Sequence, residues 1–275
     1  MVDPRTNKTA TRLRTVIITG EDPFYINRFF RELLQQVPNH PVELLGIVNL
    51  KPFNAPSKFA LARRMLRFYG PVDFLRMTWR YLLSKIRGAN LARLAARSGV
   101  PMLKTRNINS KSFLARLRGM NPDVVVSVSA PQIFRKRLLS TPRLGCWNLH
   151  GGKLPRYRGM MPSFWTLLSG EREGAITVHK MNPRLDDGDI LHQYVYPIQP
   201  GESLDHLIVR TKVLGARVLL DALERELPRT RRATRHAGEQ RPQHHPPPDC
   251  PDHHWPPLGS DRTHDAHPIL AESHA

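Results

Sequence analysis

The run DVVVSVS at residues 123–129 is the sequence feature that most restricts the fold. Three consecutive valines break the polar alternation expected of a strand with one face in water. A short β-branched run of this kind predicts a strand that is buried on both faces. Such strands lie in parallel sheets with helices on both sides, so the run indicates the α/β class.

Segments with strand and helix patterns alternate along the rest of the chain. Further strands are expected at residues 14–20, 42–50, 100–104, 147–150, 175–181 and 191–197, and helices from Asp22-Pro23 to about Val37 and at 110–120, 162–169 and 204–227. Strands separated by helices predict a mainly parallel sheet that is flanked by helices. Ligands bind at the carboxyl ends of such strands, which directs attention to the loops after Ser129, after His150 and around Asp186.

The composition excludes two other classes of protein. Two cysteines, Cys146 and Cys250, are too few for a disulfide-stabilised secreted fold. No window approaches the ~18 uninterrupted apolar residues of a membrane-spanning helix. The N-terminal sequence MVDPRTNKTATRLRT lacks the apolar core of a signal peptide. We therefore expect a cytoplasmic protein, with a peripheral position on a membrane as an alternative.

Positive charge is concentrated in one segment. The formal net charge is +19, and residues 51–97 hold eleven basic residues and one acidic residue, Asp73. One interpretation is the solvated face of helices. The other is a surface for anions, such as nucleotide phosphates, nucleic acid or an anionic membrane. On a membrane, residues 59–86 would lie as a pair of basic amphipathic helices.

The segment from Pro228 to Ala275 has a different composition. It holds eight of the thirteen histidines and nine of the 25 prolines, without hydrophobic periodicity, so we expect it to be disordered. Zinc ligation by its histidines and Cys250 is an alternative, but their spacing matches no standard zinc site and no metal is predicted. The predicted organisation is an N-terminal extension at 1–14, a main domain at 15–227 with a basic helical insertion at about 52–97, and a tail at 228–275.

Polar residues that can act on a carbonyl group are concentrated between residues 148 and 190. The sequence NLHGGKLPRYRG begins at Asn148, and the sequences TVH and LDDGDI follow at Thr177 and Leu185. Asn148 and His150 are two positions apart on an extended segment, so their side chains project to the same face. A carboxamide beside an imidazole can polarise one carbonyl oxygen and hold the oxyanion that forms on attack.

The same segment lacks a nucleophile. No serine or cysteine stands in a nucleophile motif, and Cys146 precedes the motif inside a predicted strand. This favours direct transfer to an acceptor over a covalent acyl-enzyme. A nearby aspartate would orient the imidazole or relay a proton. The alternative interpretation is a buried polar cluster without a catalytic role.

The ordered motifs resemble those of the folate-dependent formyltransferases. That family includes methionyl-tRNA formyltransferase, nucleotide-sugar N-formyltransferases and glycinamide ribonucleotide transformylase. The resemblance extends from about Val16 to Glu226 and implies a Rossmann-like formyltransferase fold, with residues 15–227 as its catalytic domain. The motif set is long and ordered, so it is more specific than a catalytic pair alone.

The resemblance also assigns residues. It implies that Asn148, His150 and Asp186 are catalytic and that 10-formyltetrahydrofolate is the formyl donor. The pterin is expected against the loop that follows the valine-rich strand and against the backbone near residues 184–188. The residues implied in binding this co-substrate are Ala130, Pro131, Gln132, Ile133, Phe134, Arg184, Asp187 and Gly188.

The implied reaction is direct attack of an acceptor amine on the formyl carbon. His150 and Asn148 would stabilise the oxyanion, and Asp186 would tune His150 and assist proton transfer. A small, phosphate-bearing acceptor is favoured, in particular a nucleotide-linked amino sugar. Residues 160–165 would line the acceptor side of the site. The alternative is that these residues start a core helix.

Three alternatives stay open at this point. Methionyl-tRNA is a less favoured acceptor, because no barrel domain of the transfer-RNA enzyme is recognised after Leu227. Glycinamide ribonucleotide is another, although the first predicted strand does not end in the phosphate loop of the purine enzyme. The third is a non-catalytic binding or membrane-surface protein that retains the fold. The sequence predicts no oligomeric state.

Overall fold

The computed structural model describes residues 12–51 apart from Pro23, a subset of residues between 62 and 82, and residues 90–235, with side chains as far as Leu227. The predicted extension at 1–14 and tail at 228–275 lie largely outside this range, as do the histidines and Cys250 considered as zinc ligands. No described helix is long and apolar enough to cross a membrane. Within the same residues, no group of three or more His, Cys, Asp or Glu side chains is placed to hold a metal ion.

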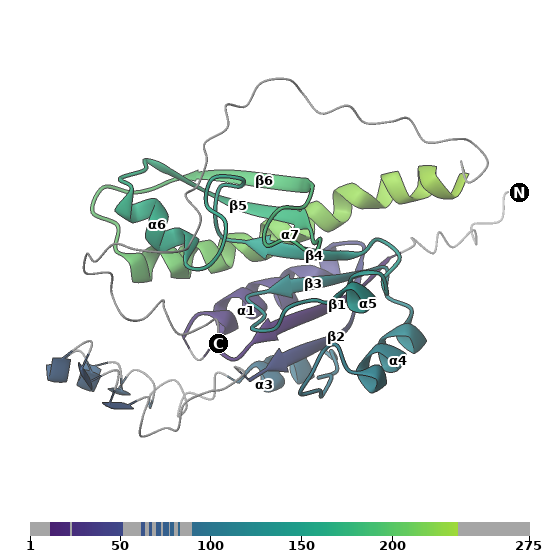
Figure 1. The fold of residues 1–275 in the computed structure, drawn as a ribbon, viewed down its shortest axis with the longest axis horizontal. Helices are drawn as coiled ribbons and strands as arrows, with labels where there is room; N and C mark the ends of the chain where they lie inside the picture. The colour runs from purple at the N-terminus through teal and green to yellow at the C-terminus, as the bar shows by residue number, and fades with distance from the viewer. Residues whose placement is uncertain are drawn as a thin grey trace, which may run out of the picture. The chain divides into compact units, whose positions relative to one another are not determined.

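The centre of the fold is a six-stranded sheet (Figure 1). Its strands lie in the order β2-β1-β3-β4-β5-β6, of which the β2–β1, β1–β3 and β3–β4 pairs are parallel and the β4–β5 and β5–β6 pairs are antiparallel. The mainly parallel sheet predicted from the sequence is confirmed. The strands are β1 (Leu13–Gly20), β2 (Val42–Leu50), β3 (Val124–Val128), β4 (Cys146–His150), β5 (Glu173–Lys180) and β6 (Ile190–Pro197).

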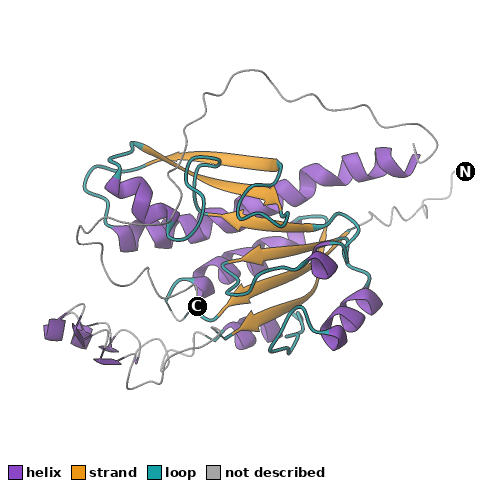
Figure 2. Ribbon diagram, in the orientation of Figure 1, coloured by secondary structure: helices purple, strands orange, loops and turns teal. Residues whose placement is uncertain are grey.

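Helices cover both faces of the sheet (Figure 2). One core cluster joins α1, α3 and α7 to the sheet, and a second joins α4 and α5 to its other face. A short helix, α6, follows β4 and contacts α7. The helices are α1 (Ile26–Gln36), continued by the 3-10 turn η1 (Val37–Asn39), α3 (Leu91–Arg97), α4 (Lys111–Met120), α5 (Lys136–Leu139), α6 (Pro162–Leu168) and α7 (Leu204–Arg235).

The valine-rich run forms β3 and is buried on both faces, as predicted. Val124, Val126 and Val128 belong to the core on the α1 and α7 side, whereas Val125 belongs to the core on the α4 and α5 side. Because successive side chains of a strand point to opposite faces, one strand contributes to both cores.

Three segments differ from the sequence-based expectations. Residues 100–104 form no strand: Met102 makes one isolated bridge to Ile47, because Pro101 has no N–H to extend the ladder. Helix α7 continues to Arg235, eight residues beyond its expected end, although Pro228 removes one helical hydrogen bond. Residues 91–97, expected within the insertion, form α3 instead.

Helix α3 is part of the main core. The Asn90 side chain caps it by accepting a hydrogen bond from the Ala92 N–H at 2.9 Å. Leu91 and Ala95 are four residues apart and are both buried in the cluster that contains α1. The expected insertion therefore ends before Leu91.

Candidate active site

The pairing of β4 with β5 places the central polar residues on one face of the sheet. Asn148 lies directly opposite His179, and His150 lies opposite Thr177. Alternation along both strands turns these side chains to the same side. Asn148 and His150 therefore share a face, as the sequence predicts.

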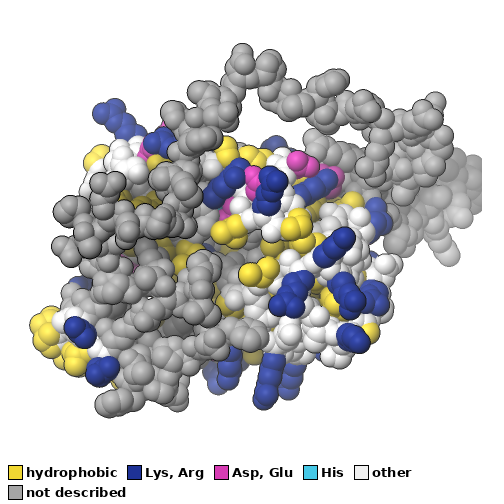
Figure 3. Space-filling view, viewed as in Figure 1, with side chains coloured by type: hydrophobic (Ala, Val, Ile, Leu, Met, Phe, Trp, Pro, Cys, Tyr) yellow, Lys and Arg dark blue, Asp and Glu magenta, His cyan; other side chains and the backbone are white. Residues whose placement is uncertain are grey.

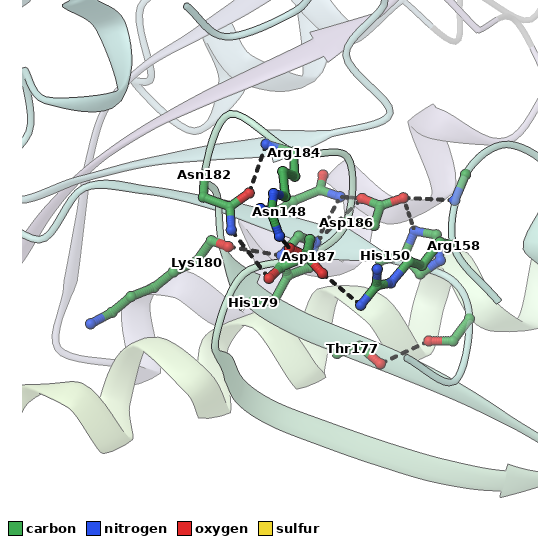
Figure 4. A network of polar contacts seen from close by, with 12 residues as sticks. Asn148, His150, Arg158, Thr177, His179, Lys180, Asn182, Arg184, Asp186 and Asp187 are labelled. Atoms are coloured by element: carbon green, nitrogen blue, oxygen red, sulfur yellow. Dashed lines mark hydrogen bonds and ion pairs between the residues drawn. The ribbon is translucent and has the colours of Figure 1, made fainter. Parts of the chain in front are cut away.

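Asp186 lies at the centre of this group and is buried (Figure 4). Its Oδ1 atom accepts a hydrogen bond from Asn148 Nδ2 at 3.1 Å and lies 3.4 Å from His179 Nε2. Its Oδ2 atom lies 3.5 Å from His150 Nδ1. The structure thus brings together Asn148, His150 and Asp186, the three residues that the resemblance implies are catalytic, and adds His179 to them.

The loop that holds Asp186 is constrained on both sides. The Gly159 N–H donates to Asp186 Oδ2 at 2.9 Å, and Asp186 itself has a left-handed φ of 48°, which non-glycine residues rarely adopt. Two residues later, Gly188 lies so close to β5 that an added Cβ would be 1.7 Å from the Lys180 carbonyl oxygen. Only glycine allows the loop to pass β5 at this distance.

The two imidazoles are oriented by main-chain carbonyl groups. His179 Nδ1 donates to the Lys180 carbonyl at 2.9 Å, which leaves Nε2 facing Asn148 and Asp186. His150 Nε2 donates to the Tyr157 carbonyl, which leaves Nδ1 facing Asp186. Asp186 therefore meets one ring nitrogen of each histidine, and each second nitrogen fixes the ring.

Burial and neighbouring charges have opposite effects on the pKa values of His150 and Asp186. Burial lowers the pKa of His150, and the negative charge of Asp186 opposes only part of this shift. Burial alone would raise the pKa of Asp186. The contact with His179, the positive charge that His150 carries when it is protonated, and the Gly159 N–H outweigh burial and leave that pKa below its ordinary value. At neutral pH the arrangement is a carboxylate beside a neutral imidazole.

Cys146 is not a nucleophile in this arrangement. It is buried in β4, where its Sγ donates to the Leu138 carbonyl at 3.5 Å. Burial raises the pKa of the thiol far above neutral pH, so the reactive thiolate does not form. This agrees with the absence of a nucleophile motif in the sequence.

Asp187, an expected co-substrate contact, is engaged by two arginines. Its carboxylate lies 2.7 Å from Arg158 and 3.5 Å from Arg184 (Figure 4). Asn182 braces the same turn, since its side chain donates to the Asp187 carbonyl at 3.1 Å and accepts from the Arg184 N–H at 2.9 Å. These contacts join the loop after β4 to the loop that holds Asp186.

The loop after β3 contains the other expected co-substrate contacts. Phe134 is buried in the core beside α4 and α5. Gln132 accepts from the Ile108 N–H at 3.1 Å and donates to the Arg106 carbonyl at 2.8 Å. Both side chains therefore have structural contacts. Ile133 is 82% exposed, Pro131 is exposed, and Ala130 is half-buried. The role of this loop in binding stays a prediction.

A pocket of about 230 Å³ opens at the carboxyl ends of β3 and β4, on the α1 and α7 side of the sheet. Its walls are largely apolar, and Lys212 of α7 and Ser129 supply polar groups. Lys212 Nζ donates to Ser129 Oγ at 2.8 Å. Burial lowers the pKa of Lys212, which the charge of Asp22 partly opposes.

Gly152 lies between Pro162, which lines the pocket, and His150 of the Asp186 group. An added Cβ on Gly152 would lie 2.7 Å from Pro162, a pocket residue, and 3.0 Å from His150 Nε2. Met161, Ser163 and Phe164 also line the pocket, and the expectation that residues 160–165 border the acceptor side stays a prediction. Part of the alternative holds, because α6 begins at Pro162.

Sequence reasoning missed three participants in this region. His179 was part of the TVH motif, but its role depends on the antiparallel pairing of β4 with β5, which the strand pattern does not reveal. The Gly159 N–H is a main-chain group and has no sequence signal. Lys212 stands on the pocket side of a long amphipathic helix, where no pattern distinguishes it from other basic residues.

Comparison with known proteins finds that the part of the chain that holds the site is similar to one family. Residues 81–223 match the family model described as Formyl transferase. Methionyl-tRNA formyltransferase of Geobacter metallireducens is 39% identical over 132 residues, which are 48% of this chain and 42% of that enzyme. The homologous enzyme of Thermotoga maritima is 37% identical over the same length and shares. The chain thus matches less than half the length of these relatives.

Solved structures share the fold at lower identity. Glycinamide ribonucleotide transformylase 1 from Symbiobacterium toebii superposes with a TM-score of 0.57 and 16% identity, over 79% of this chain and 89% of that one. A sugar N-formyltransferase from a Shewanella species superposes with a TM-score of 0.50 and 21% identity, over 79% and 71% of the two chains. These likenesses establish the fold.

Proposed function

Because the chain belongs to the formyl transferase family, we propose that it transfers a formyl group from 10-formyltetrahydrofolate to the amine of a small acceptor. The observation that supports this most directly is the convergence of Asn148, His150 and Asp186 at the carboxyl end of β4. A neutral imidazole, a carboxamide and a carboxylate are the groups that direct acyl transfer requires.

Each residue has a distinct role in the proposed reaction. 10-Formyltetrahydrofolate supplies the formyl group that the acceptor amine attacks. His150 exchanges its hydrogen bond to the Tyr157 carbonyl for one to the formyl oxygen, and Asn148 Nδ2 exchanges one of its contacts with Asp186 and His179 for one to the same oxygen. Such donors commonly tighten on the substrate only in the complex. Asp186, which lies beside His150, accepts the proton that the amine releases on attack. The bond between the formyl carbon and the folate nitrogen then breaks, that nitrogen takes up the proton, and tetrahydrofolate leaves.

Two exposed apolar residues support a donor site with a flat ring. Ile133 follows β3 and Leu185 precedes Asp186, and both side chains are largely exposed. A heteroaromatic ring that covered them would remove apolar surface from water. The proposed contacts are therefore the loop at residues 130–134 and the turn at residues 184–188, with Asp187 acting through its ion pairs with Arg158 and Arg184.

The pocket at the carboxyl ends of β3 and β4 supports a small acceptor, because its lining residue Pro162 lies near Gly152 and His150. Its apolar walls suit the body of an amine substrate, and Lys212 beside Ser129 suits a negatively charged group. No ion pair within 4 Å joins Lys212 to a carboxylate among the described side chains. A nucleotide-linked amino sugar meets both requirements, and we propose it as the acceptor class.

Methionyl-tRNA is the second candidate acceptor. It is favoured by the relatives that share 37–39% identity with this chain and are named for that substrate. The net charge of +19 also suits a polyanion. Glycinamide ribonucleotide is a third acceptor, since the Symbiobacterium structure is named for it, and it carries one phosphate that Lys212 suits equally.

The test is formyl transfer with purified protein. Release of tetrahydrofolate is followed with 10-formyltetrahydrofolate and, separately, nucleotide-linked amino sugars, glycinamide ribonucleotide and methionyl-tRNA. We expect release to require an amino sugar and to fall about 100- to 1,000-fold in His150→Ala. Release with methionyl-tRNA alone would identify the second candidate. Release that is unchanged in His150→Ala would contradict the proposed mechanism.

A further inference from the structure

The helical segment between residues 62 and 82 presents large apolar side chains to solvent. Val72, Leu75 and Trp79 are exposed over 78%, 70% and 63% of their surface, and Leu82 is also exposed. The main chain is helical at all four positions. Single exposed apolar residues are ordinary, but several large ones on one helix mark an interaction surface.

These four residues have the spacing of one face of an α-helix. At about 100° per residue, Val72, Leu75, Trp79 and Leu82 fall within an arc of about 80°. Arg76 follows about 40° beyond Val72 and is exposed. We call the four residues the apolar face of this helix.

Exposed arginines occur in the same segment as the apolar face. Arg63 and Arg67, on the preceding part of the segment, are exposed like Arg76. Figure 3 shows hydrophobic and basic side chains together on the described part of this segment, at the lower left. Residues 51–97 as a whole hold eleven basic residues against one acidic residue. A partner must therefore offer both an apolar phase and negative charge.

An anionic lipid bilayer meets both requirements, and we propose that the apolar face binds one. Val72, Leu75, Trp79 and Leu82 would lie at the boundary between headgroups and acyl chains, with the arginines at the lipid phosphates. A second copy of the chain would bring two strongly positive segments together. Nucleic acid would neutralise the arginines but would leave the aliphatic side chains in water. This inference is independent of the proposed formyl transfer.

Vesicle flotation of the full chain tests the proposal. Vesicles of phosphatidylcholine alone are compared with vesicles in which about one third of the lipid is phosphatidylglycerol, at low salt and at about 0.5 M NaCl. We expect flotation with the anionic vesicles, weakened by salt, and little with phosphatidylcholine alone. Equal flotation with both vesicle types, or none with the anionic vesicles, would overturn the proposal.

Paired variants identify the surface. Leu75→Glu combined with Trp79→Glu should weaken partition into anionic vesicles by about tenfold or more. Leu168→Glu combined with Val195→Glu adds the same charge at exposed apolar positions of α6 and β6 and should leave partition unchanged. Equal loss in both pairs, or in neither, would contradict the assignment to the apolar face. The unfolding midpoint of each variant confirms that it is folded.

Tryptophan fluorescence provides a second measurement on the same samples. Anionic vesicles should shift the emission to shorter wavelength as Trp79 leaves water, and Trp79→Phe should remove that shift while retaining flotation. A shift that persists in Trp79→Phe would come from another tryptophan and would argue against insertion of the apolar face. If the protein sediments as a dimer, a second copy of the chain is the favoured partner instead. If RNA competes with vesicles for the protein, nucleic acid is the favoured partner.

Discussion

Asp186 is in contact with four groups, namely the Asn148 amide, one ring nitrogen each of His150 and His179, and the Gly159 N–H. A buried carboxylate is costly unless it is paired and hydrogen-bonded. The donors around Asp186 meet that requirement, and the low pKa of the group records the result. Because this carboxylate lies beside His150, its negative charge raises the pKa of that imidazole and opposes part of the effect of burial.

A substitution at Asp186 tests this coupling. Burial lowers the pKa of His150, and the negative charge of Asp186 raises it part of the way back. Asp186→Asn removes that charge, so the pKa of His150 should fall further below 6.5. NMR titration of the His150 ring checks the direction, with Asp187→Asn as a control that removes a neighbouring carboxylate. A rise in the pKa of His150 in Asp186→Asn would refute the coupling.

His179 is expected to act by positioning Asn148 and Asp186. In His179→Gln the amide stands near the position of Nε2 and can keep these contacts, whereas in His179→Asn the amide reaches only the position of Nδ1. Loss of hydrogen bonds to a charged group costs about 1.5–3 kcal/mol, or roughly 10- to 100-fold in kcat. Steady-state kinetics should show this loss in His179→Asn, with little change in KM.

The glutamine variant separates positioning from a general structural effect. We expect His179→Gln to retain most of kcat because it keeps a polar group at the right distance from Asp186. If both variants lose kcat equally and unfold at lower temperature, His179 serves the core alone. A near-normal kcat in both His179→Gln and His179→Asn would show that Asn148 keeps its position without the contact to residue 179.

At the scale of elements, the loop between β5 and β6 depends on Gly188. A methyl group there would overlap the Lys180 carbonyl, so Gly188→Ala must push the loop away from β5 and carry Asp186 with it. A displacement of about 1 Å at a catalytic group can cost 100-fold in rate, and overpacking of this kind costs about 1–3 kcal/mol in stability. Transfer kinetics and thermal unfolding measure the two effects.

A second glycine provides the matched control. Gly119 lies within α4, and in the described part of the chain no atom beyond its neighbours and the helix backbone lies within 4 Å of an added Cβ. Gly119→Ala should leave transfer unchanged and raise stability by up to about 1 kcal/mol, because alanine favours the helix. A normal rate in Gly188→Ala would mean that the loop can move without displacing Asp186.

How far the sequence predicts these elements depends on the kind of signal. β3 is recognisable because burial on both faces demands a continuous β-branched run, and α4 because Ser110 caps an amphipathic pattern. The antiparallel direction of β5 and β6 has no such signal, since a buried strand has the same pattern in either direction. The sequence therefore could not predict that Asn148 lies opposite His179. It did predict that Asn148 and His150 share one face of a strand.

Two expectations were wrong because the local sequence did not distinguish between two kinds of structure. The arginines of α3 resemble those of the preceding insertion, so its two core residues, Leu91 and Ala95, were assigned to that insertion. At residues 100–104, Val100 and Leu103 are buried as in a strand, but Pro101 removes a donor that the ladder requires. The hydrophobic pattern of a segment therefore predicts which side chains are buried, but it does not predict the hydrogen-bond partners of the main chain.

At the scale of the molecule, the described part of the chain builds its two cores from residues between Leu13 and Leu227. Helix α7 closes the larger core through residues such as Leu219, Leu220 and Leu223, which are fully buried. The described residues up to Arg235 form one compact unit. We therefore propose that the segment ending at Arg235 is sufficient for folding and for transfer, and that residues 236–275 add little stability.

A chain that ends after Arg235 tests this proposal. Changes away from core features usually stay within about 0.5 kcal/mol, which for a domain of this size shifts the unfolding midpoint by less than about 2 °C. We expect such a shift and an unchanged transfer rate. A chain that ends after Leu214 is the control, because it removes the buried part of α7 and should not fold. A fall of more than about 4 °C on removing residues 236–275 would mean that this segment packs against the core, because only buried contacts stabilise a domain by that amount.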